Sequence, residues 1–148
     1  CDTGAWSLYS RGAPSSHESD LGYHKLLRDF LTQLCKRTAA EEYCGAEQHF
    51  SEYLVSPPLI EPLTSRITAR TTGNVRFKLS KISRVTLKIT RDGQTVALIN
   101  PGTLSRGTKN IRWTAPKKTG EYEVTINATD LAGNTATATG AITVKKRG

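Results

Sequence analysis

The chain has no methionine, and it has no apolar run long enough to cross a bilayer as a helix. No secretory signal peptide is visible, and the chain opens with Cys1. We therefore interpret it as a fragment of a longer protein or as a processed mature form, without a membrane span.

Histidine and cysteine are absent from residues 64–148, and acidic residues are scarce there. This half carries sixteen Lys/Arg against four Asp/Glu, a formal charge of +12, whereas residues 1–63 carry five against nine, a charge of −4. Such an asymmetry marks a domain boundary and predicts that the second half meets polyanions.

The usual signs of a self-contained enzyme are also missing. The sequence offers no Ser-His-Asp arrangement, no carboxylate pair on a shared face and no metal-ligand spacing among its three histidines. These absences disfavour a free-standing hydrolase, and we expect neither a metal nor a cofactor.

Residues 1–55 predict a loop followed by two helices. Ser19 or Asp20 can cap a helix that runs to about Thr38, and a second helix fits residues 39–54. The first helix has apolar side chains at helical spacing, namely Tyr23, Leu26, Leu27, Phe30, Leu31 and Leu34. Two helices with one stripe each cannot enclose a core, so we expect a further layer, either the sandwich described next or a missing upstream domain.

Cys35 and Cys44 flank the turn predicted between these helices. They are close enough to form a disulfide, which would indicate an oxidising compartment. The alternative is a pair of small buried thiols in a reduced protein. With the disulfide formed, Cys1 has no partner within the chain.

The proline-rich residues 56–63 predict a stiff linker, and from Thr64 the apolar period changes to two. We expect seven short strands near residues 65–70, 75–79, 85–89, 96–98, 111–113, 122–126 and 142–144. The dipeptide Asp92-Gly93 predicts a tight hairpin turn. The fold class is therefore mainly β, a seven-stranded antiparallel sandwich over residues 64–148 preceded by a two-helix segment.

The end of the chain carries a resemblance. The runs Gly120-Glu121-Tyr122-Glu123-Val124 and Ala128-Thr129-Asp130-Leu131-Ala132-Gly133-Asn134 resemble the last two strands of bacterial Ig-like modules, including that of the flagellar hook-cap protein. The resemblance implies an Ig-like fold and a secreted or cell-surface location, and it says little about a ligand. We expect Asp130 to cap its turn, in preference to a Ca²⁺ site.

The strand face that alternates with the core carries cations, namely Arg76, Lys78, Lys88 and Arg112. They could simply form a soluble surface that blocks aggregation. However, the net charge of +12 on residues 64–148 exceeds the net charge of roughly 2–8 in magnitude that a small domain needs for solubility. The sharper hypothesis is a polyanion partner such as an acidic polysaccharide, a wall polymer or nucleic acid. Because Phe77, Trp113 and Tyr122 fall on the core face, sequence-specific or single-stranded nucleic acid is disfavoured.

A second resemblance covers residues 2–54. The run from Asp2 to Arg11 (DTGAWSLYSR), the run Tyr23-His24-Lys25-Leu26-Leu27 and the closing Tyr53-Leu54 resemble the extreme C-terminal end of the D-glucuronyl C5-epimerase family. Enzymes of this family epimerise uronic acid residues within a polysaccharide. The two-helix segment would then be the end of an α-helical catalytic domain that lies mostly upstream.

This resemblance implies roles for four residues. Tyr9 and Tyr23 match the family's active-site tyrosines, and Arg11 is the nearest match to its substrate-binding arginine, although it follows Tyr9 by two residues where the family has three. His24 matches the residue after the second tyrosine, with a substrate-binding or structural role. The alternative is that the aromatic residues of this loop only fasten it to its neighbours.

Two hypotheses follow. In the first, the chain is the C-terminal fragment of a secreted uronate C5-epimerase, inactive alone, whose full-length form removes and returns the proton at C5 and whose basic module holds the acidic polymer. In the second, it is a non-catalytic Ig-like module that binds a polyanion or carbohydrate or acts as a cell-surface spacer.

Overall fold

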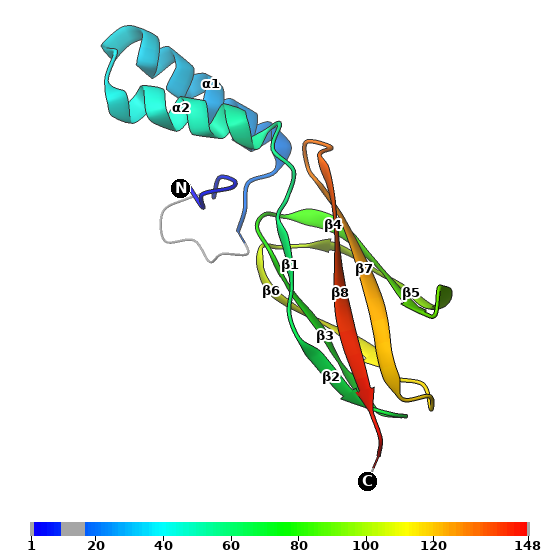
Figure 1. Cartoon of the computed structure of the whole chain (residues 1–148). Helices are drawn as coiled ribbons and strands as arrows, with labels where there is room; N and C mark the ends of the chain where they lie inside the picture. The colour runs from blue at the N-terminus through cyan, green and yellow to red at the C-terminus, as the bar shows by residue number, and fades with distance from the viewer. Residues whose placement is uncertain (1, 10–16, 148) are drawn as a thin grey trace.

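The computed structural model describes residues 2–9 and 17–147, as an elongated body with a helical hairpin at one end and the C-terminus at the other (Figure 1). The helices are α1 (Leu21–Thr38) and α2 (Glu41–Tyr53). The strands are β1 (Ile60–Pro62), β2 (Ser65–Thr68), β3 (Thr72–Leu79), β4 (Ser83–Arg91), β5 (Gln94–Leu104), β6 (Gly107–Thr114), β7 (Gly120–Asp130) and β8 (Thr135–Lys145). Among the described residues, no helix has the length and apolar character that a membrane span needs.

The two predicted helices are confirmed. Asp20 caps α1, because its Oδ1 accepts a hydrogen bond from the Tyr23 N–H at 2.7 Å. The helix ends at Thr38, and its cap residue Ala39 has a left-handed φ of 52° and donates its N–H to the Cys35 carbonyl at 2.8 Å. The helix α2 begins at Glu41, two residues later than expected.

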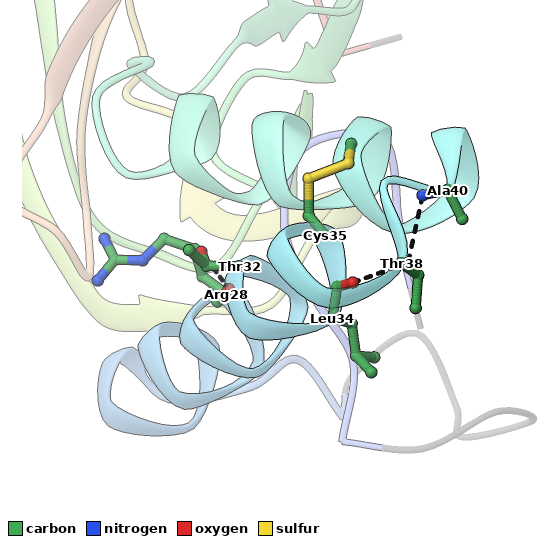
Figure 2. Close-up of a disulfide and its surroundings, with 7 residues drawn as sticks. Arg28, Thr32, Leu34, Cys35, Thr38 and Ala40 are labelled. Carbon is green, nitrogen blue, oxygen red and sulfur yellow. Dashed lines mark hydrogen bonds between the residues drawn. A yellow bond between two sulfur atoms is a disulfide. The ribbon is translucent and has the colours of Figure 1, made fainter.

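A disulfide joins the two helices across their turn (Figure 2). It links Cys35 to Cys44, whose Cα atoms lie 4.8 Å apart. The Thr38 hydroxyl donates to the Leu34 carbonyl at 2.7 Å and accepts from the Ala40 N–H at 3.2 Å, which gives this N–H of the turn a partner (Figure 2). The expected disulfide is therefore confirmed.

The strands form two sheets, with the orders β1-β3-β6 and β2-β8-β7-β4-β5. The number of strands is thus eight, not seven, because Ile60–Pro62, inside the expected linker, pairs with β3. A proline is tolerated there because β1 is an edge strand. The sandwich is also not wholly antiparallel, since β2 pairs in parallel with β8. The chain runs from β1 directly into β2 and so crosses from one sheet to the other.

The predicted turn between β4 and β5 has the expected geometry. Asp92 and Gly93 have φ values of 50° and 80°, as a type I′ turn requires. Its right-handed twist matches that of the flanking strands, so the hairpin continues the sheet.

The core lies between the two sheets, and its residues come from the alternation seen in the sequence. Trp113 and Tyr122 meet edge to face with ring centroids 5.6 Å apart. Side chains with no exposed surface line both sheets, namely Val75, Phe77, Val85, Ile89, Ile126, Ala128 and Ile142. Full burial of each large aliphatic side chain contributes about 1.5–3 kcal/mol.

The helical hairpin meets the sandwich only near its base (Figure 1). Leu26 and Phe30, on one face of α1, remain 63% and 60% exposed. The sandwich therefore does not cover the apolar stripe of this helix.

Candidate functional site

A buried ammonium group fastens the helices to the sandwich. Lys81, in the turn between β3 and β4, is 1% exposed, and its Nζ lies 2.6 Å from Asp130 Oδ2. The same Nζ donates to the carbonyl of Tyr53, the last residue of α2, at 2.8 Å and to that of Ser56 at 2.5 Å. All three protons of the ammonium thus have an acceptor, which a buried charge requires. The ring of Trp6 lies 5.2 Å from this cation.

Asp130 also organises the turn between β7 and β8. Its Oδ1 accepts hydrogen bonds from the backbone N–H groups of Ala132 at 3.0 Å and Asn134 at 2.8 Å, as a turn-capping side chain should. The side-chain amide of Asn134 donates to the Leu54 carbonyl at 2.8 Å and so adds a second link to the helices. Within residues 2–9 and 17–147, no three His, Cys, Asp or Glu side chains gather in a way that could hold a metal ion.

Glu18 makes the corresponding link from the N-terminal loop. It is 5% exposed, and its carboxylate accepts from the backbone N–H groups of Ile82 at 2.5 Å and Arg106 at 2.6 Å. Burial raises the pKa of this carboxyl above its usual value, against the lowering effect of the two N–H donors. The loop is thereby held against two turns of the sandwich.

His24 lies inside the N-terminal part, with no exposed surface. Its Nε2 donates to the Phe50 carbonyl at 2.9 Å, so Nδ1 accepts from the Ser7 hydroxyl at 2.8 Å. The Trp6 ring stacks on it with centroids 3.9 Å apart. Burial lowers the pKa of His24, which favours the neutral ring. In this position the residue joins the loop to both helices, and its substrate-binding role stays a prediction.

Tyr9 and Tyr23, the expected catalytic pair, lie against each other with ring centroids 4.7 Å apart. The Tyr9 hydroxyl donates to Asp20 Oδ2 at 2.7 Å, and this hydrogen bond raises the pKa of Tyr9, the opposite of what a general base needs. The Tyr23 hydroxyl donates to the Tyr9 carbonyl at 3.1 Å. A sugar ring has no room between these two rings. Their catalytic roles stay a prediction, and Arg11 lies outside the described residues.

The four cations expected on the strand face lie on opposite sides of the sandwich. Arg76 and Lys78 on β3 and Arg112 on β6 share the outer face of the three-stranded sheet, where Arg112 pairs with Asn74 and Arg76 with Asn110. Lys88, on β4, faces outward from the five-stranded sheet. The structure therefore brings three of the four together.

These cations have few anionic partners. Of the sixteen Lys/Arg in residues 64–148, only Lys81 and Arg91 lie within ion-pair distance of a carboxylate in the described part of the chain. Phe77, Trp113 and Tyr122 are 0%, 7% and 3% exposed, so these aromatic rings face the core as expected. The outer faces thus offer positive charge without stacking surfaces.

A hollow of about 540 Å³ lies where the N-terminal loop meets the three-stranded sheet. Residues 3–5 form one wall, and the ends of β1, β3 and β6 form the other, with Lys78 and Arg106 both lining it. The hollow therefore continues the basic face of this sheet towards the helices.

Sequence reasoning missed Lys81, Glu18 and Arg106. Lys81 is one of sixteen Lys/Arg in residues 64–148, yet it falls in the short segment between two alternating strands, where a charge has no outward strand position. That break in the pattern is the one local signal it offers. Nothing near Glu18 in the sequence indicates its partner Ile82, which is 64 residues away.

Two packed sheets around one apolar core place residues 60–145 among the β-sandwich proteins. The family of bacterial Ig-like domains matches residues 63–145, more than half of the chain, and the chain belongs to this family. The resemblance noted in the last two strands is therefore confirmed. Residues 2–54 lie outside this match, and their resemblance to the C5-epimerase family stays a prediction.

Several solved structures show a weak similarity to this chain. CopC from Methylosinus trichosporium OB3b is 14% identical, with a TM-score of 0.46, over 61% of this chain and 97% of that chain. Murine CRIg is 10% identical with a TM-score of 0.41, over 63% and 100%. A chitin binding domain from Burkholderia pseudomallei is 12% identical with a TM-score of 0.39, over 59% and 61%. At these values the likenesses carry no argument about function. A search of curated proteins finds no match.

Proposed function

We propose that this chain is a non-catalytic Ig-like module that binds acidic polymers through the outer face of its three-stranded sheet. The observation that carries the proposal is the unpaired positive charge on that face. Arg76, Lys78 and Arg112 are exposed and make no ion pair among the described residues. Cations without internal partners keep their full potential for an external polyanion.

The shape of this face suits an extended chain. Arg76 and Lys78 are two residues apart on β3, which separates them by about 6.6 Å along the strand. Arg112 follows on the neighbouring strand, opposite Asn74, and so continues the row away from the helices. A row of separated cations fits the repeated charges of a linear acidic polymer better than a single small anion. The disulfide supports an extracellular setting, where such polymers occur.

The test measures binding of a polyuronate to the full chain at several salt concentrations. Changing Arg76, Lys78 and Arg112 together to Gln should weaken binding and flatten its dependence on salt, because fewer counterions are released. The matched control changes Arg66, Arg84 and Lys88, which removes the same charge from the other sheet and should have a smaller effect. The proposal is wrong if the chain binds no acidic polymer at low salt, or if the two triple variants lose affinity equally.

A second candidate function is the closing segment of a C5-epimerase. One observation favours it: the exposed Leu26 and Phe30 leave an apolar helix face that a larger helical domain could cover. In a longer protein carrying the upstream sequence, Tyr9→Phe and Tyr23→Phe should each reduce exchange of the C5 proton with solvent deuterium. Unchanged exchange in both variants removes these residues from the mechanism.

A further inference from the structure

The hollow beside the N-terminal loop is large enough to hold a small ligand. Its volume of about 540 Å³ falls in the range of roughly 300–1,000 Å³ that small-molecule sites occupy. A ligand unit can therefore enter here.

Two cations and one carboxylate line this hollow. Lys78 is exposed on β3, and Arg106 precedes β6, where Glu18 holds its backbone N–H at 2.6 Å. The Arg106 Nε is buried and has no hydrogen-bond partner in the described part of the chain. Glu61 stands directly opposite Lys78 in the β1–β3 pairing, yet no ion pair links them there. The exposed Lys78 ammonium is therefore open to an added anion, and Arg106 adds positive charge to the wall beside it.

The remaining walls combine hydroxyls with apolar surface. Ser80 and Thr108 line the hollow and both carry hydroxyls, of which that of Ser80 already accepts from the Leu59 N–H at 2.7 Å and keeps its proton to donate. Leu59, also in the lining, is 75% exposed. A sugar ring presents hydroxyls at its edge and C–H groups on its faces, so this mixture suits it better than it suits a bare phosphate.

We propose that the hollow binds one carboxylate-bearing sugar unit, with its carboxylate towards Lys78 and Arg106 and a C–H face towards Leu59. The assignment rests on the function proposed above, because it places one unit of the acidic polymer at the end of the cation row. Such a unit would make a charge-assisted contact with each cation.

The site is composite. Residues 3–5 form one of its walls, and the loop that contains them is held against the sandwich by Glu18 and by the contact of Trp6 with Lys81. The three-stranded sheet alone would leave the hollow open on one side. The N-terminal segment thus gives this Ig-like module a depth that a bare sandwich face does not have.

The experiment compares two probes on the full chain by calorimetry: a hexuronic acid tetrasaccharide and the same tetrasaccharide with its carboxyl groups reduced to alcohols. We expect the acidic probe to bind at least about tenfold more tightly than the reduced one. Arg106→Gln should lower the affinity for the acidic probe by about tenfold, a loss that corresponds to about 1.4 kcal/mol of binding free energy. The control Arg84→Gln, on the other sheet, should change binding by less than about twofold.

A gain of affinity guards against misfolding. Glu61→Gln removes the carboxylate beside Lys78 and should tighten binding of the acidic probe by about threefold, with no effect on the reduced probe, since only a negative ligand is repelled by Glu61. A misfolded variant cannot produce this result.

The proposal is overturned if both probes bind equally, if Arg106→Gln binds the acidic probe as the wild type does, or if a short oligonucleotide binds as tightly and is lost in the same variant. Failure here is distinct from failure of the proposed function. A long polyuronate that binds while the tetrasaccharide does not would reject the hollow and keep the basic face.

Discussion

At the scale of single residues, the interface between the N-terminal segment and the sandwich depends on a few buried polar groups. Lys81 and Glu18 are both almost without exposed surface, and each contacts backbone groups far away in the sequence. Buried charges are costly unless they are fully paired, so each of them fixes one arrangement of the two parts and penalises others.

Replacing Lys81 should therefore destabilise the folded chain strongly. Lys81→Met leaves the Asp130 carboxylate buried without its cation and leaves two carbonyls without donors, which should lower the free energy of unfolding by about 3–5 kcal/mol. Urea unfolding followed by tryptophan fluorescence measures this. The control Lys88→Met removes an exposed charge and should cost less than about 0.5 kcal/mol. A loss below about 1 kcal/mol in Lys81→Met would contradict the account.

His24 should make stability depend on pH. Burial lowers its pKa in the folded chain, so the folded state prefers the neutral ring more than the unfolded state does. The stability from this preference is fully present above the unfolded value of about 6.5 and is lost as the pH falls below it. Glu18 acts in the opposite sense, because its raised pKa favours the folded state at low pH, below its usual titration range.

Melting temperatures between pH 7.5 and pH 5.5 test this prediction, since carboxylates with ordinary pKa values stay ionised in that window. The wild type should melt at lower temperature at the acidic end. His24→Gln should have a lower melting temperature than the wild type, but that temperature should not change between pH 7.5 and pH 5.5. His49→Gln, which removes an exposed ring, should keep the pH dependence of the wild type. An equal slope in His24→Gln would show that another group causes it.

At the scale of elements, the disulfide determines how firmly the helical hairpin holds together. Closing the loop between Cys35 and Cys44, nine residues apart, stabilises the hairpin by about 2.5 kcal/mol in the chain-entropy account. A Cys35→Ala, Cys44→Ala double variant should therefore exchange its α1 and α2 amide protons faster by about 50-fold or more, while amides of β4 and β7 keep their protection. Equal loss of protection in the sandwich would mean that the two parts unfold as one unit.

The elements also show what the sequence can predict. Alternation located the strands from β3 to β8, since each has one face on the core, and Asp92-Gly93 located a turn by its backbone requirement. The strand β1 was missed because Pro57, Pro58 and Pro62 indicate a linker and because a strand of three residues is too short to show alternation. Parallel pairing of β2 could not be foreseen, because its partner lies more than seventy residues later in the chain.

The candidate site was predicted in part for the same reason. The outward positions of Arg76, Lys78 and Arg112 follow from alternation within a strand. The hollow does not, because its walls come from residues 3–5, β1, β3 and β6, and only the folded chain brings these together. Contacts such as that between Glu18 and Arg106, 88 residues apart, leave no local pattern.

At the scale of the whole molecule, the two ends differ in the sign of their net charge. Residues 1–63 carry a net charge of −4 and hold the helical hairpin at one end, whereas residues 64–148 carry +12 along the sandwich. A polyanion should therefore approach the sandwich and avoid the helices, and its binding should weaken as salt screens charges beyond a Debye length of about 8 Å at physiological ionic strength.

Mapping by NMR tests the central claim most directly, namely that the outer face of the three-stranded sheet binds acidic polymers. On titration of the full chain with a polyuronate at low salt, the account predicts amide shifts concentrated in β1, β3 and β6 and in residues 3–5, with the outer face of β7 and β8 unchanged. Shifts confined to the five-stranded sheet, or no shifts at all, would contradict it.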